Sequence, residues 1–210
     1  RRVLFRSRRA GGGGGASGGD GRTNGGRDRG GAAAQGIRLA ATSVSVYLEN
    51  LYIAGFNTSE AGLITDGADC FARCLTIESC TTGWVHKGCS TQFSDSELYG
   101  NGVGFYCDNS GVGQTGCTTL TNIRATYCTT HGFDIVNSHN IKLIGCSANA
   151  EVNTKFTTAG LYIGGSSSDV DVVGFNAWLG ALSTTGAGIQ IDGTARDISI
   201  ADCSAYKFLN

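Results

Sequence analysis

The chain of 210 residues contains no proline and no methionine, and it has no long apolar run. Glycine is abundant, at 34 residues, but a glycine-rich chain without proline is neither collagen-like nor a proline-rich linker. A membrane-spanning helix needs about 18 or more consecutive apolar residues, and no stretch of this sequence approaches that length. Because methionine is absent, we expect the chain to be a fragment of a longer reading frame.

Charge is distributed unevenly along the chain. The first 36 residues contain 13 Gly, 8 Arg and 2 Asp, so residues 37–210 retain 8 Lys and Arg against 15 Asp and Glu, a net charge of −7. A Gly/Arg-rich segment without apolar periodicity cannot bury enough surface to fold, and we expect residues 1–36 to be disordered. Residues 1–7 resemble the translated end of a sequencing adaptor, which indicates a sequencing or cloning scar. The acidic remainder argues against nucleic acid as a partner.

A glycine followed by a large apolar residue recurs through the rest of the chain. These glycines are Gly62, Gly83, Gly104, Gly132, Gly160 and Gly188, at spacings of 21, 21, 28, 28 and 28 residues. Repeats of this length are typical of solenoids, in which each repeat buries its apolar face against the next one.

Between these units lies a second pattern, in which two apolar–polar–apolar triplets are separated by two residues. Such alternation predicts short strands with one face directed inward. The apolar slots are Val46, Leu48, Leu51, Ile53; Ala72, Cys74, Ile77, Ser79; Thr91, Phe93, Ser96, Leu98; Thr118, Leu120, Ile123, Ala125; Ile141, Leu143, Cys146, Ala148; Val170, Val172, Phe175, Ala177; and Ile198, Ile200, Cys203, Ala205. The second residue of the gap reads Asn50, Thr76, Asp95, Asn122, Gly145, Gly174 and Asp202. Asn, Asp and Gly tolerate the left-handed backbone conformation, so the pattern predicts one sharp corner per repeat.

Each repeat is predicted to contain a strand, a corner, a second strand, a loop and a glycine-led strand. This order predicts an all-β solenoid. We expect a single-stranded parallel β-helix of about seven coils with three short strands each over residues 37–210. A leucine-rich repeat is excluded, because the sequence has neither its leucine consensus nor a helical pattern. The prediction places seven residues in one inward stack: Leu48, Cys74, Phe93, Leu120, Leu143, Val172 and Ile200.

The Asn-bearing corner, the strand ladders and the long third turn resemble the right-handed parallel β-helix of the pectate lyases and phage tailspikes. The resemblance covers about residues 37–210, without the family's N-terminal capping helix, and the chain stops inside a coil, so we expect the fold to continue beyond both ends. It implies an extracellular or virion-surface protein that recognises a polysaccharide or cell-surface glycan. The resemblance is compatible with a homotrimer, and no membrane span is expected.

In that family the substrate groove follows the outer face of the strand after the long third turn, which corresponds here to the glycine-led strand. Its outward residues are Ile64, Val85, Tyr106, Asp134, Tyr162 and Gln190, and the next outward set is Asp66, Lys87, Asp108, Val136, Gly164 and Asp192. Sugars stack on aromatic rings while acids bind their hydroxyls, so Tyr106, Tyr162, Gln190 and His131 are predicted to bind substrate. The long loops 108–117 and 149–159 are expected to wall this face.

Several chemistries fit these residues. A glycosidase needs two carboxylates, and Asp134 with Asp108 matches the wider, inverting separation. A lyase needs a base, for which Lys155 or His131 is available, with Ca²⁺ on Asp108 and Asp134 as an option. Alternatively, Asp108 only starts a turn. A non-catalytic tail-fibre shaft or adhesin is the competing function, so cleavage itself is left open.

The nine cysteines are an odd number without a C-x-x-C motif, which favours neither a fully paired disulfide framework nor a zinc ribbon. Cys74, Cys107, Cys146 and Cys203 are predicted to be inward core residues. Cys70, Cys80, Cys89, Cys117 and Cys128 are predicted to lie in turns. His86 is expected to be a hydrogen-bonded core residue beside Trp84. His86, His131 and His139 do not share a face of the predicted solenoid, so no metal site is predicted.

Overall fold

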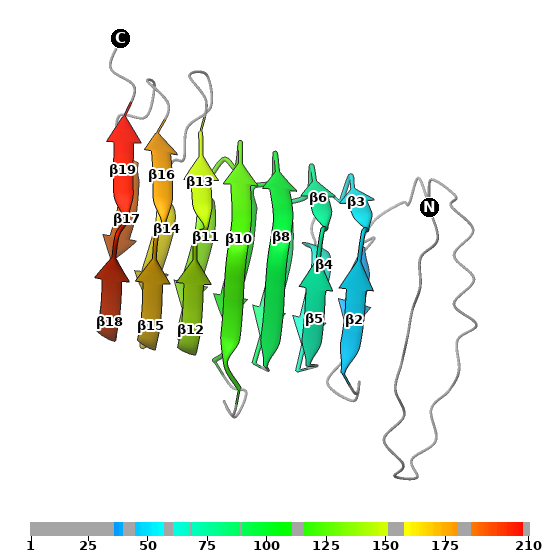
Figure 1. Ribbon diagram of the computed structural model, residues 1–210, viewed down its shortest axis with the longest axis horizontal. Helices are drawn as coiled ribbons and strands as arrows, with labels where there is room; N and C mark the ends of the chain where they lie inside the picture. Colours follow the sequence, from blue (N-terminus) through cyan, green and yellow to red (C-terminus); the bar gives the residue numbers. More distant parts are fainter. Residues whose placement is uncertain are drawn as a thin grey trace, which may run out of the picture.

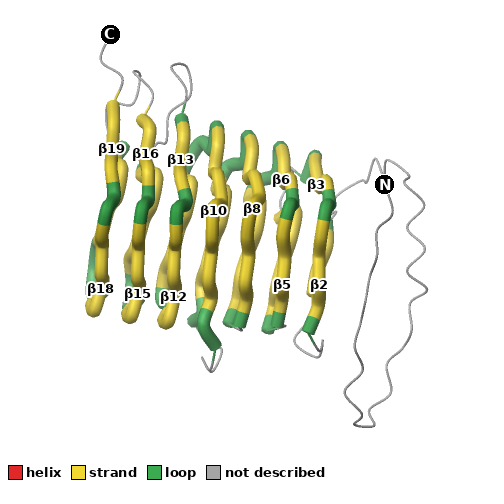
Figure 2. Tube along the Cα trace, viewed as in Figure 1, coloured by secondary structure: helices red, strands yellow, loops and turns green. Residues whose placement is uncertain are grey.

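The computed structural model describes residues 36–39, 45–56, 61–67, 69–88, 90–110, 116–150, 158–179 and 186–207. These residues form strands, turns and bends, as Figure 2 shows in yellow and green, with no helix among them. No helix that is long and apolar enough to cross a membrane therefore occurs in these ranges. The predictions for residues 1–35, for Cys89 and for Lys155 lie outside the described residues.

The glycine-led strands form one parallel sheet, which we call the glycine ladder. Its seven strands pair in chain order: β1 (Ile37–Leu39), β4 (Ala61–Asp66), β7 (Thr82–Lys87), β9 (Val103–Asp108), β11 (His131–Val136), β14 (Ala159–Gly164) and β17 (Ala187–Ile191). All six pairings are parallel, so each strand lies one coil above the previous one.

The second sheet has 12 strands in two rows that meet at the corners. The first row contains β2 (Val46–Glu49), β5 (Cys70–Arg73), β12 (His139–Ile144), β15 (Ser168–Val173) and β18 (Arg196–Ala201). The second row contains β3 (Tyr52–Ala54), β6 (Thr76–Glu78), β13 (Ser147–Asn149), β16 (Asn176–Leu179) and β19 (Ser204–Lys207). Two longer strands, β8 (Thr91–Tyr99) and β10 (Thr118–Thr126), run through both rows. Figure 1 views this sheet face on, with the glycine ladder behind it.

The predicted all-β parallel solenoid is confirmed. The solenoid has about five turns, slightly fewer than the seven coils that the sequence predicted.

Positive φ angles mark the corner of every coil. They occur at Asn50 (55°), Cys74 (54°), Asp95 (50°), Asn122 (53°), Gly145 (61°), Gly174 (66°) and Asp202 (54°). The prediction is correct in six coils and wrong in the second, where Cys74 and not Thr76 occupies the corner. The strand register shows why, since Leu48 pairs with Ala72 and Val46 with Cys70. A shift of two residues preserves the alternation of a strand, so an apolar pattern does not distinguish the two registers.

This shift changes the interpretation of two cysteines. Cys74 is exposed at the corner and was wrongly assigned to the core, whereas Cys70 is buried in β5 and does not lie in a turn. Ala72 takes the predicted place of Cys74 in the inward stack. Cys107 and Cys146 are buried as predicted, and all eight cysteines in the described ranges are free thiols.

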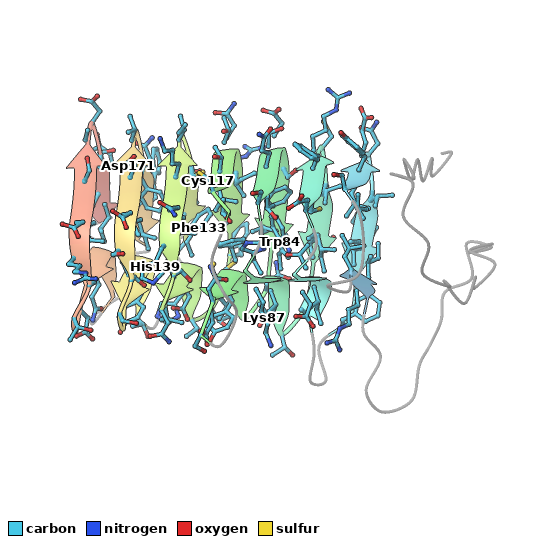
Figure 3. All side chains as sticks on the ribbon, turned by 90° about the horizontal axis from the view of Figure 1, so that it is seen from below. Trp84, Lys87, Cys117, Phe133, His139 and Asp171 are labelled. Atoms are coloured by element: carbon cyan, nitrogen blue, oxygen red, sulfur yellow. The ribbon has the colours of Figure 1, made fainter. Side chains whose placement is uncertain are left out.

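The interior is a continuous stack of apolar side chains. Leu48, Ala72, Phe93, Leu120, Leu143 and Val172 align from coil to coil and are buried, while the aligned Ile200 of the terminal coil is exposed. Trp84 packs edge-on against Phe93 and Phe105, with ring centroids 4.3 and 5.1 Å away. In Figure 3, Trp84 and Phe133 lie between the sheets, whereas Asp171 and Lys87 project outward on opposite sides.

His86 is a core residue, as expected from its position beside Trp84. Its ring nitrogens lie 2.8 Å from the hydroxyl oxygens of Thr65 and Thr118, which belong to different sheets. The Thr65 hydroxyl also accepts a hydrogen bond from the Trp84 indole at 3.0 Å. These contacts satisfy a polar ring in an apolar interior.

The repeated glycine has a steric reason. A Cβ atom on Gly132 would lie 2.6 Å from the Ala148 Cβ and 2.7 Å from the Gly160 carbonyl oxygen. Gly132 and Phe133 are both buried, so two consecutive residues face inward and the strand alternation is interrupted. As a result, His131 and Asp134 both lie on the outer side of β11, although they are three residues apart.

Candidate functional site

The outward residues of the glycine ladder align as the sequence predicts. Tyr106 pairs with Asp134, Asp134 pairs with Tyr162, and Tyr162 pairs with Gln190. Each pair therefore occupies neighbouring coils, about 4.8 Å apart across a parallel sheet. We call these four residues, together with His131, the outer strip.

His131 and Asp134 form the centre of the outer strip. The His131 Nδ1 atom lies 3.5 Å from the Asp134 Oδ2 atom, and the two side chains are only 12% and 14% exposed. The His131 ring also lies beside the ring of Tyr162, with centroids 5.5 Å apart. The sequence suggested His131 separately, as a substrate-binding residue or a lyase base, but did not predict this pairing.

Three polar atoms of this pair are buried without a hydrogen-bond partner. They are Asp134 Oδ1 and both ring nitrogens of His131. Burial and, to a lesser extent, the negative charge of Asp108 together raise the pKa of Asp134 to about 6. Burial also lowers the pKa of His131. Buried unsatisfied polar groups are rare in folded proteins and are often found at functional sites.

Asp108 has the opposite environment. Its Oδ1 atom accepts hydrogen bonds from the Ser110 backbone amide at 2.9 Å and from Asn137 Nδ2 at 3.5 Å, and its Oδ2 atom accepts one from the Tyr106 hydroxyl at 3.1 Å. Burial raises the pKa of this carboxyl, but these hydrogen bonds outweigh it, so the pKa of Asp108 lies below its ordinary value. Burial and the hydrogen bond to Asp108 raise the pKa of Tyr106 to about 12, so this phenol stays protonated.

Tyr162 is held in a similar way. Its hydroxyl donates a hydrogen bond to Asp192 Oδ2 at 3.1 Å. The ring lies across Gly164, where an added Cβ would be 2.4 Å from the tyrosine hydroxyl oxygen. Both tyrosines therefore lean along the strand toward an aspartate and flank Asp134 from the two neighbouring coils.

Some predicted features lie outside the described residues. Lys155 is one of them, as are residues 111–115 and 151–157, which form most of the two expected loop walls. Gln190 is partly buried on β17 at the end of the outer strip. No group of three or more His, Cys, Asp or Glu side chains within the described ranges is arranged to hold a metal ion. A Ca²⁺ site on Asp108 and Asp134 stays a prediction.

Sequence reasoning also missed a polar groove of about 450 Å³ at the corners of the second sheet. Its lining includes Asp95, Glu97, Asn122 and Arg124. The Asn122 amide donates a hydrogen bond to Asp95 at 3.1 Å across adjacent coils. Asp95 and Asn122 occupy the corners themselves, and in the sequence they are typical turn residues, whereas Glu97 and Arg124 pair on the strands that follow.

No protein-family model matches the chain, and neither a curated protein nor a solved structure matches it.

Proposed function

We propose that the outer strip recognises a polysaccharide at a cell or virion surface, in the manner of tailspikes and pectate lyases. The observation that carries this proposal is the buried, unpartnered Asp134 Oδ1 between Tyr106 and Tyr162. A sugar hydroxyl would donate the missing hydrogen bond, and the flanking rings offer apolar surface for the faces of neighbouring sugars.

The charge of this face favours an uncharged glycan. The outward residues of the glycine ladder include four carboxylates, Asp66, Asp108, Asp134 and Asp192. Asp66 forms an ion pair with Arg38, whereas Asp134 lies beside His131, whose lowered pKa favours the neutral ring. From β4 to β17, Lys87 is the only lysine or arginine among the outward residues of the glycine ladder. A polyuronate would meet like charges here, so we favour a glycosidase over a lyase.

The two carboxyls suit acid–base hydrolysis. Asp134 would donate its proton to the glycosidic oxygen as that bond breaks. Asp108 would take a proton from a water molecule whose oxygen bonds to the anomeric carbon. When the surroundings of two carboxyl groups move their pKa values apart, the group with the higher pKa can act as the acid and the other as the base. Their backbone offset of one coil and two residues is roughly 8 Å, which fits an inverting pair.

The test combines binding and cleavage on a panel of soluble uncharged polysaccharides: hydroxyethylcellulose, mixed-linkage glucan, galactomannan and dextran. Affinity gel electrophoresis measures binding, and the release of reducing ends measures cleavage. We expect Tyr162→Ala to weaken binding and Asp134→Asn to lower cleavage at least about a hundredfold while the fold is retained. Asp171→Asn, on the outer side of the second sheet, is the matched control.

The outcomes separate the alternatives. Binding that Tyr106→Ala and Tyr162→Ala leave unchanged would place recognition elsewhere. Binding without release of reducing ends would make the domain a non-catalytic adhesin. An absence of both binding and cleavage would favour the alternative function, a non-catalytic tail-fibre shaft.

A further inference from the structure

A second set of aromatic side chains lies on the outer side of the second sheet. One position at or next to the end of the strands in the second row aligns from coil to coil: Ala54, Glu78, Tyr99, Thr126, Asn149, Trp178 and Tyr206. Trp178 is 45% exposed and Tyr206 is 58% exposed. Large aromatic groups exposed in register along a sheet are a common feature of binding surfaces.

The aromatic residues form two groups, one on each side of Asn149. Tyr99 and Tyr127 have ring centroids 5.0 Å apart, and Trp178 and Tyr206 have centroids 6.0 Å apart. Asn149 pairs with Thr126 on one side and Trp178 on the other. The two groups are therefore separated by a single coil.

Asn149 supplies an independent indication of a ligand. Its Oδ1 atom is buried and has no hydrogen-bond partner. A buried carbonyl oxygen without a donor destabilises the fold, and a ligand hydroxyl would satisfy it.

A row of small polar side chains runs beside the aromatic row. Two residues earlier on the same strands, Ser147, Asn176 and Ser204 pair from coil to coil, and Ser204 donates a hydrogen bond to the Asn176 side chain. Between Asn149 and Tyr206 neither row contains a charged residue at these positions.

We infer that Asn149, Trp178 and Tyr206, with the adjacent Ser147, Asn176 and Ser204, form a second saccharide-binding surface for an uncharged glycan that runs along the solenoid axis. The rings would stack on sugar faces, while the hydroxyl and amide row would bind the sugar edges. The absence of charge at these positions disfavours an acidic ligand or a nucleic acid. The aromatic and polar rows themselves contain no aliphatic side chain, but Ile144 and Val173 are exposed in neighbouring coils across the corner, so a protein contact on this side is the alternative that sedimentation tests. This surface lies on a different sheet from the outer strip and does not depend on its function.

The two tryptophans make this inference directly measurable, since Trp84 is fully buried and Trp178 is exposed. Acrylamide should quench Trp178 selectively, and a glycan that covers it should reduce that quenching. The probes are hydroxyethylcellulose, mixed-linkage glucan, galactomannan and dextran, each tested alone. We expect at least one of them to protect Trp178 and to retard the protein in affinity gels.

Variants assign the effect to the surface. Trp178→Ala and Tyr206→Ala should each weaken retardation about tenfold or more, whereas Tyr47→Ala, an exposed tyrosine on β2 in the first row, should not. Circular dichroism checks that each variant is folded. Tyr162→Ala, in the outer strip, should leave the protection of Trp178 intact.

Three results would overturn the inference. The first is an absence of protection and of retardation with all four polysaccharides. The second is retardation that Trp178→Ala and Tyr206→Ala leave unchanged but Tyr162→Ala abolishes, which would assign binding to the outer strip alone. The third is a change of sedimentation coefficient in Trp178→Ala, which would identify this face as a contact between copies of the chain.

Discussion

The Nδ1 atom of His131 lies 3.5 Å from the Oδ2 atom of Asp134, although the two residues are three positions apart in a strand. Regular alternation would place them on opposite faces of the sheet. The two inward residues Gly132 and Phe133 bring them to the same side. The glycine repeat that shapes the solenoid therefore also brings together a buried histidine and a buried aspartate, three of whose polar atoms have no hydrogen-bond partner.

The buried Asp134 carboxyl should make stability depend on pH. Its pKa rises from the ordinary 3.8 to about 6, so the folded state binds this proton more tightly than the unfolded state. The resulting stabilisation is complete below about pH 4 and is lost as the pH rises through about 6. We expect the free energy of unfolding of wild type, relative to Asp134→Asn, to fall by about 1–2 kcal/mol from pH 4 to pH 7, after allowance for solvent screening.

Urea unfolding at pH 4, 5, 6 and 7 measures this difference. The lowered pKa of His131 acts in the opposite direction, because its neutral form is favoured by folding. The comparison is therefore repeated in a His131→Gln background, where Tyr106, Tyr162 and Asp108 remain the neighbouring titratable groups. A wild-type-to-variant difference that does not change with pH would contradict the raised pKa.

Gly132→Ala should destabilise the solenoid by about 1–3 kcal/mol, as overpacking of a close contact does. The added methyl would lie 2.6 Å from Ala148 Cβ and 2.7 Å from a backbone oxygen of the next coil. Gly100→Asn is the control, because Gly100 has open space around it and a φ of 61° that asparagine tolerates. Thermal unfolding of both variants should show a large loss for the first alone. Equal melting temperatures would mean that the coils move apart easily.

Leu143→Ala should cost roughly 2–5 kcal/mol, because it opens a cavity in the inward stack. Leu143 is fully buried between Leu120 and Val172. The neighbouring Lys142→Ala removes only an exposed pair with Asp171 at 3.6 Å, which should contribute less than about 1 kcal/mol. Denaturant midpoints compare the two variants. Similar losses at both positions would place Leu143 outside the core.

The cysteines should differ sharply in reactivity. Burial raises the pKa of Cys70, Cys107 and Cys128 to about 12, so their thiolates are scarce at neutral pH. Cys74 and Cys117 are exposed. Brief treatment with iodoacetamide at pH 8, followed by peptide mass spectrometry, should show labelling of the two exposed cysteines first. Rapid labelling of Cys70 in the folded protein would support the turn position that its sequence suggested.

The sequence by itself determined the solenoid, because its signals are local. Alternation needs only neighbouring residues, and Asn50, Asp95, Asn122 and Asp202 report the left-handed corner through their own conformational preference. The same reasoning failed at Cys74, since a cysteine at a corner has no turn signal and its apolar character suggested a core position.

Only the tertiary structure decided how the outward residues interact. The identity of Asp134 and Asp108 was readable, but their different pKa values depend on burial and on hydrogen bonds from Ser110 and Asn137. The pairing of His131 with Asp134 follows from the close approach of Gly132 to Ala148, which belongs to the other sheet. The Asn137–Asp108 hydrogen bond joins residues 29 positions apart, and the Gly132–Ala148 contact joins residues 16 positions apart. A pattern of neighbouring residues carries no information about such distances.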